Sequence, residues 1–235
     1  MRKQEFYRQE YRRLKTDWQD SLTIYRDVIN QQTNSETCIL DIGCGHGDFL
    51  KPVYDKTLHT YGVDPDKEAL HKNTLIKNKV VGVVENLPFE SNFFDLVVSE
   101  FVLEHLDNPD KAFREIYRVL KPGGRVVFLT PNVWNYNVWI IRMIPNVFHD
   151  FFTRKLYDRQ EGDTYPVRYK INSVKRIEKT LGPIGFKKSQ VILNGDPSYI
   201  SFNRPLFAFA CLLEKILDLR PLHFGKVHLI GVYEK

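Results

Sequence analysis

The chain has 235 residues, of which 43% are hydrophobic and 27% are charged, and its formal net charge is +5. These proportions are those of an ordinary globular protein, so they exclude disordered, collagen-like and coiled-coil classes. The length suits one large domain with an elaboration better than two full-sized domains.

The cysteine content and the apolar runs indicate where the protein works. Cys38, Cys44 and Cys211 are odd in number and lack paired spacing, which argues for a reducing compartment and against a disulfide framework or a metal site. The N-terminus has no apolar stretch typical of a secretory signal. The longest apolar run, residues 206–213, is far shorter than the roughly 20 residues that span a bilayer. We therefore expect a cytoplasmic protein without a transmembrane segment.

Positive charge is concentrated late in the chain, where residues 121–235 carry 18 basic and 9 acidic side chains. Such an excess would suit a phosphate-bearing substrate, a nucleic acid or an anionic membrane surface. The charges are scattered singly, however, and an ordinary solvated surface is the simpler interpretation.

The first 130 residues predict a long helix followed by alternating strands and helices. Apolar residues at spacings of three and four predict one helix over residues 4–30. Short apolar runs then predict strands over residues 38–42, 59–63, 80–84, 94–99 and 125–130. Helical spacing between them covers residues 48–57, 66–77 and 109–120. This alternation implies an α/β fold with a mostly parallel sheet, whose ligand lies at the carboxyl ends of the strands.

The regular alternation stops after Thr130. Residues 131–170 are rich in aromatic side chains and have no clean period, so we predict an inserted cap there and a second one at about residues 196–224. Between the caps we expect a helix at 173–181, a turn at 182–185 and a strand at 186–193. The second cap contains a helix at 206–219, and a strand at 226–233 follows it. Residues 1–36 form a helical extension and residues 37–235 one domain in this interpretation.

The strongest motif is a strand that runs into a glycine-rich turn, Leu40-Asp41-Ile42-Gly43-Cys44-Gly45-His46-Gly47-Asp48. Glycines let the backbone turn tightly and approach a ligand closely. The next strand ends at Asp64, about where such folds place an acid against ribose hydroxyls. A dinucleotide site would have a third glycine at position 48, but the residue is Asp48, which would repel a pyrophosphate. A cofactor without phosphate fits better.

Four further segments accompany the glycine turn, namely Tyr61 to Pro65, Glu85 to Phe89 with Phe93 to Val97, Val102 to Leu106, and Arg114 to Gly124. With these motifs, in this order, the chain resembles the class I S-adenosylmethionine-dependent methyltransferases, in particular the small-molecule, quinone-biosynthesis-like branch called methyltransferase type 11. The resemblance covers about residues 37–130 and, more loosely, 171–193 and 226–233. It implies a Rossmann-like sandwich with a seven-stranded sheet, mostly parallel, whose last strand is antiparallel.

The resemblance also implies roles for individual residues. Asp41 and the Gly43-Cys44-Gly45 backbone would hold the amino-acid end of S-adenosylmethionine, and Asp64 would bind the ribose diol. Pro65, Val84 and Glu85 would flank the adenine, and Ser99, Glu100 and Phe101 would line the methionine portion. The chain departs from the family at Val83, where an acidic residue is frequent, so the contact to the adenine amino group stays open between the backbone and Glu85.

The acceptor side is less defined. A general base is needed only if the acceptor retains its proton, and His105, after the fourth strand, is our candidate. The candidate substrate contacts in the cap are Asn132, Trp134, His149 and Tyr165. The fourth strand exits as Ser-Glu-Phe-Val and lacks the Asn/Asp-Pro-Pro-Tyr/Phe motif of amine methyltransferases that act on adenine, so a nucleic-acid acceptor is not expected. The aromatic cap favours a small, partly apolar acceptor.

Three alternatives remain open. A nicotinamide-dependent oxidoreductase is disfavoured by Asp48, and a non-catalytic adenosyl-binding protein would share the turn but not the acceptor pocket. The helix at 206–219 is apolar around most of its circumference, so it is either a packed lid or a contact with a membrane surface. The oligomeric state is left open.

Overall fold

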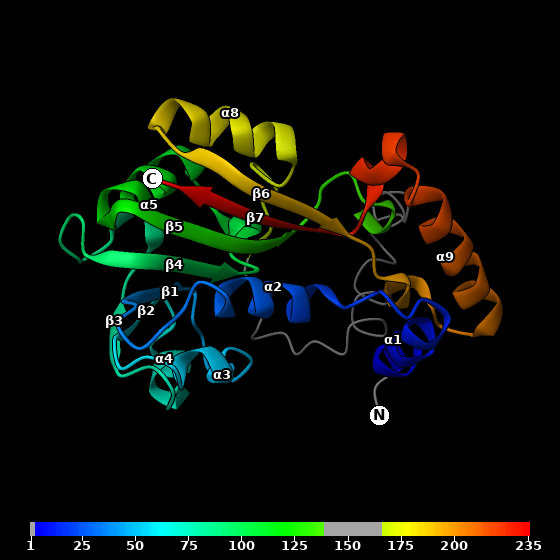
Figure 1. Ribbon diagram of the computed structural model, residues 1–235, viewed down its shortest axis with the longest axis horizontal. Helices are drawn as coiled ribbons and strands as arrows, with labels where there is room; N and C mark the ends of the chain where they lie inside the picture. Colours follow the sequence, from blue (N-terminus) through cyan, green and yellow to red (C-terminus); the bar gives the residue numbers. More distant parts are fainter. Residues whose placement is uncertain (1–2, 139–165) are drawn as a thin grey trace.

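One seven-stranded sheet organises the protein, and the computed structural model describes residues 3–138 and 166–235. The strands lie in the order β3-β2-β1-β4-β5-β7-β6 (Figure 1). Only β7 runs antiparallel to its neighbours, β5 and β6. The predicted α/β class, the mostly parallel sheet and the antiparallel last strand are confirmed. The strands are β1 Ile39–Ile42, β2 Thr60–Asp64, β3 Asn78–Val81, β4 Phe94–Glu100, β5 Leu120–Pro131, β6 Lys187–Asn194 and β7 His228–Glu234.

Helices cover both faces of the sheet (Figure 1). The α-helices are α1 Lys3–Leu14, α2 Ser21–Asn30, α3 Lys51–Tyr54, α4 Lys67–Lys72, α5 Pro109–Val119, α8 Val174–Ile184 and α9 Arg204–Leu217. The 3-10 helices are η1 Val84–Asn86, η2 Leu103–His105, η4 Pro197–Ile200 and η5 Arg220–Gly225. α5 and α8 pack on one face, and α2, α3 and α4 on the other. Because both faces are covered, the central strands read as near-continuous apolar runs.

Each face of the sheet has its own hydrophobic core. Phe94, Phe113 and Phe128 are fully buried on the α5 and α8 side. Tyr25 and Ile29 of α2 are fully buried on the opposite side. Burial of a large apolar side chain contributes about 1.5–3 kcal/mol, so these two layers fix β1 and β4 in place and, with them, the carboxyl edge of the sheet.

The prediction of a single helix over residues 4–30 is wrong, because the chain forms α1 and α2 with a break between them. Asp20 caps α2 by accepting a hydrogen bond from the Thr23 amide at 2.9 Å. In the break, the buried Trp18 donates its indole N–H to the Gly195 carbonyl at 2.8 Å. Leu14, which the single-helix pattern placed on the apolar stripe, is 69% exposed. The capping carboxylate and the long-range indole contact together outweigh the local periodicity.

Further boundaries also differ from the predictions. The helix expected over 66–77 ends at Lys72, and the strand expected from residue 125 begins at Leu120. The strand expected over 80–84 ends at Val81, and Val84 already belongs to η1. The helix expected over 48–57 shrinks to α3. The turn expected at 182–185 is the end of α8, which continues to Ile184 and stops at Gly185, whose φ of 116° is left-handed. A glycine in that conformation is the common C-terminal signal of a helix.

The second predicted cap, at 196–224, falls on η4, α9 and η5, which gather with α1 at one end of the molecule (Figure 1). Arg8 of α1 forms an ion pair with the buried Asp196 at 2.8 Å, which joins the N-terminal helix to this region. Among the helices that the structure describes, none is both long and apolar enough to cross a membrane.

Candidate functional site

The glycine turn after β1 lies at the point where strand order reverses, between β1, β2 and β4. Gly43 has a φ of +71°, and its amide donates to the Val63 carbonyl at 2.8 Å. A Cβ at this position would lie 2.3 Å from the Val102 side chain. Both the left-handed backbone and the close approach require glycine. The turn is thus clamped between β2 and the segment that follows β4.

Asp64, at the end of β2, connects the glycine turn to β2 through hydrogen bonds. One carboxylate oxygen of Asp64 accepts the Gly45 amide at 2.9 Å, and the other accepts the Asp66 amide at 2.8 Å. Asn73 donates its side-chain amide to the Gly45 carbonyl at 3.0 Å. Cys44, between the two glycines, is buried in the core and has no resolved metal or redox partner among the described residues. The carboxylate predicted to bind ribose therefore also orders the turn.

A buried carboxyl group, Asp41, and a partly buried one, Glu100, lie behind the turn on the adjacent strands β1 and β4. Asp41 of β1 accepts a hydrogen bond from the Tyr54 hydroxyl. Burial raises the pKa of Asp41 to about 7, which the Tyr54 hydrogen bond opposes and the nearby Glu100 and Asp64 reinforce. Burial likewise raises the pKa of Glu100 to about 7. An acidic edge of this kind repels phosphate and is complementary to a cation.

The predicted adenine residues lie on the β2 and β3 side of the turn. Pro65 is exposed directly after β2, and Val84 is buried at the start of η1. Glu85 accepts the Asn108 amide at 3.4 Å, so its carboxylate is directed to the start of α5. The Gly82 amide donates to the Asp64 carbonyl at 3.1 Å, which keeps the β3 exit beside β2.

The β4 exit brings the other predicted cofactor residues to the same edge. Ser99 is buried, and its hydroxyl has no hydrogen-bond partner in the described part of the chain. Phe101 has a φ of +53°, which is rare for a residue with a side chain. Its amide donates to the Leu129 carbonyl at 2.9 Å. Strained backbone of this kind gathers at functional sites, because the surroundings must hold it in place.

The predicted acceptor residues are dispersed. The His105 ring is 3.0 Å from the Pro166 carbonyl, measured from Nδ1. Asn132 is buried and donates its amide to the Phe224 carbonyl at 2.6 Å and the Lys226 carbonyl at 2.9 Å. Trp134 is 48% exposed. His149 and Tyr165 lie outside the described residues. Both amide hydrogens of Asn132 are therefore donated to backbone carbonyls, whereas about half of the Trp134 surface is exposed.

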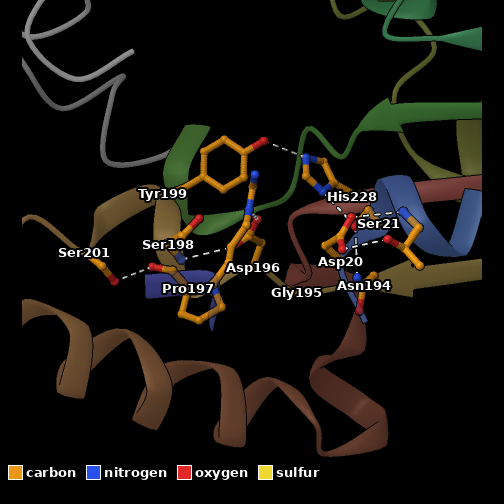
Figure 2. Close-up of polar contacts among 12 residues, drawn as sticks. Asp20, Ser21, Asn194, Gly195, Asp196, Pro197, Ser198, Tyr199, Ser201 and His228 are labelled. Atoms are coloured by element: carbon orange, nitrogen blue, oxygen red, sulfur yellow. Dashed lines mark hydrogen bonds and ion pairs between the residues drawn. The ribbon is translucent and has the colours of Figure 1, made fainter. Parts of the chain in front are cut away.

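Sequence reasoning missed His228, the first residue of β7. Because β7 is antiparallel to β5, His228 pairs with Pro131 and lies at the carboxyl edge of the parallel strands. Its ring centre is 5.6 Å from that of Phe101. Figure 2 shows His228 between Ser21 and Tyr199, with Nδ1 2.9 Å from the Ser21 hydroxyl and Nε2 3.0 Å from the Tyr199 hydroxyl. Burial lowers the pKa of His228 to about 4, so the ring is neutral at pH 7.

Comparison with known proteins agrees with this geometry. Residues 40–128 match the methyltransferase-domain family called methyltransferase type 11. A ubiquinone/menaquinone biosynthesis C-methyltransferase of Vibrio parahaemolyticus is 38% identical over 104 residues, which are 39% of this chain and 40% of the relative. An uncharacterized protein of Methanocaldococcus jannaschii is 29% identical over 173 residues, 70% of this chain and 67% of the relative.

The fold comparison points the same way. An S-adenosylmethionine-dependent methyltransferase from Mesorhizobium loti superposes with a TM-score of 0.57 at 19% identity, covering 89% of this chain and 95% of that one. Together these matches support a class I S-adenosylmethionine-dependent methyltransferase of the type 11 branch. The cofactor of this family is S-adenosylmethionine, and its product is S-adenosylhomocysteine. The chain nevertheless spans only about two fifths of the length of the quinone-pathway relative.

The raised pKa of Asp41 leads to a testable prediction about ligand binding. A cationic ligand binds the ionised carboxylate, so affinity for S-adenosylhomocysteine, through its ammonium group, should fall as pH drops from 8 to 6 through the pKa of about 7. We expect a loss of roughly two- to tenfold per pH unit, because one proton must leave for each ligand bound. Calorimetric titration at pH 6, 7 and 8 measures it.

Two variants separate the groups involved. Asp41→Asn should flatten part of this pH dependence and Glu100→Gln the rest. The free energy of unfolding should fall as pH rises, whereas the affinity should increase. The reason is that a pKa raised in the folded state favours the folded protein at low pH, and this stabilisation is lost as pH rises through about 7. Asp41→Asn without ligand should therefore be more stable than the wild type at pH 8. A wild-type affinity that is flat between pH 6 and 8 contradicts the assignment.

Proposed function

We propose that the protein transfers a methyl group from S-adenosylmethionine to a small, partly apolar acceptor by in-line displacement. The observation that carries this proposal is the acidic, glycine-lined edge made by Asp41, Asp64 and Glu100 at the strand-order reversal. That edge offers carboxylates to a cation. The buried Ser99 hydroxyl without a partner beside it is consistent with a ligand that supplies one.

When bound, S-adenosylmethionine supplies an electrophilic methyl group on a positively charged sulfur that leaves as a neutral thioether. The chain's own residues have to align the acceptor atom with the methyl group and the sulfur, and they have to exclude water. Asp41 and the Gly43-to-Gly45 backbone would hold the amino-acid end, and Asp64 the ribose. Phe101, whose strained backbone is held by the hydrogen bond to the Leu129 carbonyl, would line the side of the pocket that faces the methyl group of the cofactor.

A hydroxyl acceptor would need a group that takes its proton. His105 is one candidate. The Tyr199–His228 pair is a second, because the neutral His228 ring keeps one nitrogen unprotonated and its Nε2 lies 3.0 Å from the Tyr199 hydroxyl. Tyr199 is only half-buried, so it rather than His228 would contact an acceptor. A carbon or amine acceptor that is already nucleophilic would need no proton acceptor, and both groups would then only position it.

The experiment has two stages on the full chain. Calorimetric titration with S-adenosylhomocysteine and, separately, with NAD+ should show binding of the first and not of the second, since pyrophosphate meets Asp48 and the acidic edge. Transfer of label from methyl-labelled S-adenosylmethionine in a screen of small phenols, quinols and amines then tests catalysis. Tight binding of NAD+ would overturn the cofactor assignment, and binding without transfer to any acceptor would favour an adenosyl-binding protein.

A further inference from the structure

The helix α9 leaves one row of large apolar side chains exposed, whereas an ordinary surface helix turns its apolar row toward the core. Its only buried residues are Ala210 and Glu214. Leu206, Phe209, Leu212 and Ile216, spaced three or four apart, are 38–57% exposed. Single exposed leucines need no explanation, but a continuous stripe of large apolar residues on one helix face does.

An ion-pair cluster fixes this orientation. Glu214 pairs with the buried Lys226 at 2.7 Å and accepts the Tyr136 hydroxyl at 2.9 Å. Lys226 also pairs with Asp218 at 2.8 Å. Gly195 makes the room, because a Cβ there would lie 1.8 Å from a Glu214 carboxylate oxygen. The charged side of α9 is thus anchored to the domain, and rotating the apolar stripe inward would bury an unpaired charge, which costs several kcal/mol.

The apolar surface continues beyond the helix and has a basic rim. Phe202 before α9 and Leu219 and Phe224 after it are 36–59% exposed. The exposed Arg204, Lys215 and Arg220 form no ion pair within the part of the chain that the structure describes. The acidic residues of this segment, Glu214 and Asp218, are both paired to lysines. The segment therefore combines exposed phenylalanine and leucine side chains with basic side chains that have no acidic partner among the described residues, and both of its acidic side chains are paired.

We propose that the α9 face, defined as residues 202–224 with their exposed apolar stripe, docks the protein on an anionic lipid surface. An interfacial helix has this composition, with phenylalanine and leucine on one side and lysine and arginine beside it. α9 forms the outer end of the molecule along its long axis (Figure 1), so it can meet a flat surface. A symmetric pairing of two α9 faces would instead place the basic rims of both copies together. Positive charge on each rim argues against a second copy and for anionic headgroups.

Vesicle flotation of the full chain tests the proposal. The protein should float with vesicles of phosphatidylcholine and phosphatidylglycerol, and less with phosphatidylcholine alone. Phe209→Asp with Leu212→Asp should reduce binding at least tenfold, since it removes two apolar side chains and adds repulsion. Lys215→Gln and Arg220→Gln should each reduce it about fivefold, the effect of one basic residue near an anionic surface. Binding should weaken with added salt.

A matched control is Leu58→Asp, which changes a leucine that is 70% exposed in the loop before β2, away from the α9 face. It should float like the wild type. All variants should keep the wild-type affinity for S-adenosylhomocysteine, which shows that they fold and keeps the result independent of the proposed methyl transfer. Failure of the wild type to float on anionic vesicles overturns the proposal. So does a concentration-dependent dimer in light scattering that Phe209→Asp with Leu212→Asp dissolves, because the face would then be covered by a second copy.

Discussion

Gly43→Ala is expected to lower the melting temperature by about 5–15 °C and to abolish measurable binding of S-adenosylhomocysteine. Two costs add at this position. A side chain at φ +71° costs about 1–2 kcal/mol, and the new Cβ, 2.3 Å from the Val102 methyl, forces a shift that costs about 1–3 kcal/mol. For a chain of this length, each kcal/mol shifts the melting temperature by roughly 2–4 °C. Thermal unfolding and calorimetric titration measure the two effects.

Gly47→Ala is the matched control in the same turn, since it has no positive φ and a Cβ there meets nothing within 4 Å. Its stability should stay within about 0.5 kcal/mol of the wild type. Adding Val102→Ala to Gly43→Ala should restore part of the stability, because it removes the clash and leaves the backbone strain. If Gly43→Ala behaves like Gly47→Ala, the turn is not clamped as described and its close approach to a cofactor loses support.

The sheet could be predicted from the sequence because its signals are local. Buried parallel strands are short apolar runs, and the position of Asp64 beside the glycine turn follows from the alternation of strand and helix. The break between α1 and α2 could not be predicted, because it depends on Trp18 reaching the Gly195 carbonyl, 177 residues away in the chain. Local periodicity contains no information on that contact.

The features that the sequence analysis missed or left open were hidden for the same reason, because they too depend on contacts between distant parts of the chain. His228 lies in no motif, and only the antiparallel direction of β7 brings it to the cofactor edge, where Tyr199 and Phe101 meet it. That direction was expected from the family resemblance, but the strand was expected to begin at residue 226, so the resemblance alone did not single out His228. The buried face of α9 could not be read from its apolar circumference, because Lys226 and the space beside Gly195 select Glu214 as the inward residue.

Asp64 is the carboxylate on which the ribose assignment depends. Each of its oxygens already accepts one backbone amide, from Gly45 at 2.9 Å and from Asp66 at 2.8 Å. A carboxylate can accept about four hydrogen bonds in all, so one further bond per oxygen remains for two ribose hydroxyls. These two amides fix the carboxylate before a ligand arrives, so little conformational entropy is lost on binding.

Asp64→Ala should therefore weaken S-adenosylhomocysteine binding by about 10- to 100-fold, which corresponds to about 1.5–3 kcal/mol for hydrogen bonds to a charged group. Asp66→Ala is the control two residues away, because Asp66 accepts the Glu68 and Ala69 amides and caps α4. It should cost about 1 kcal/mol of stability through the lost cap and leave the affinity close to that of the wild type. Equal losses in both variants would place the effect in the β2–α4 loop rather than at the ribose. An unchanged affinity for Asp64→Ala would mean that this carboxylate does not bind the ribose, although it accepts the Gly45 amide.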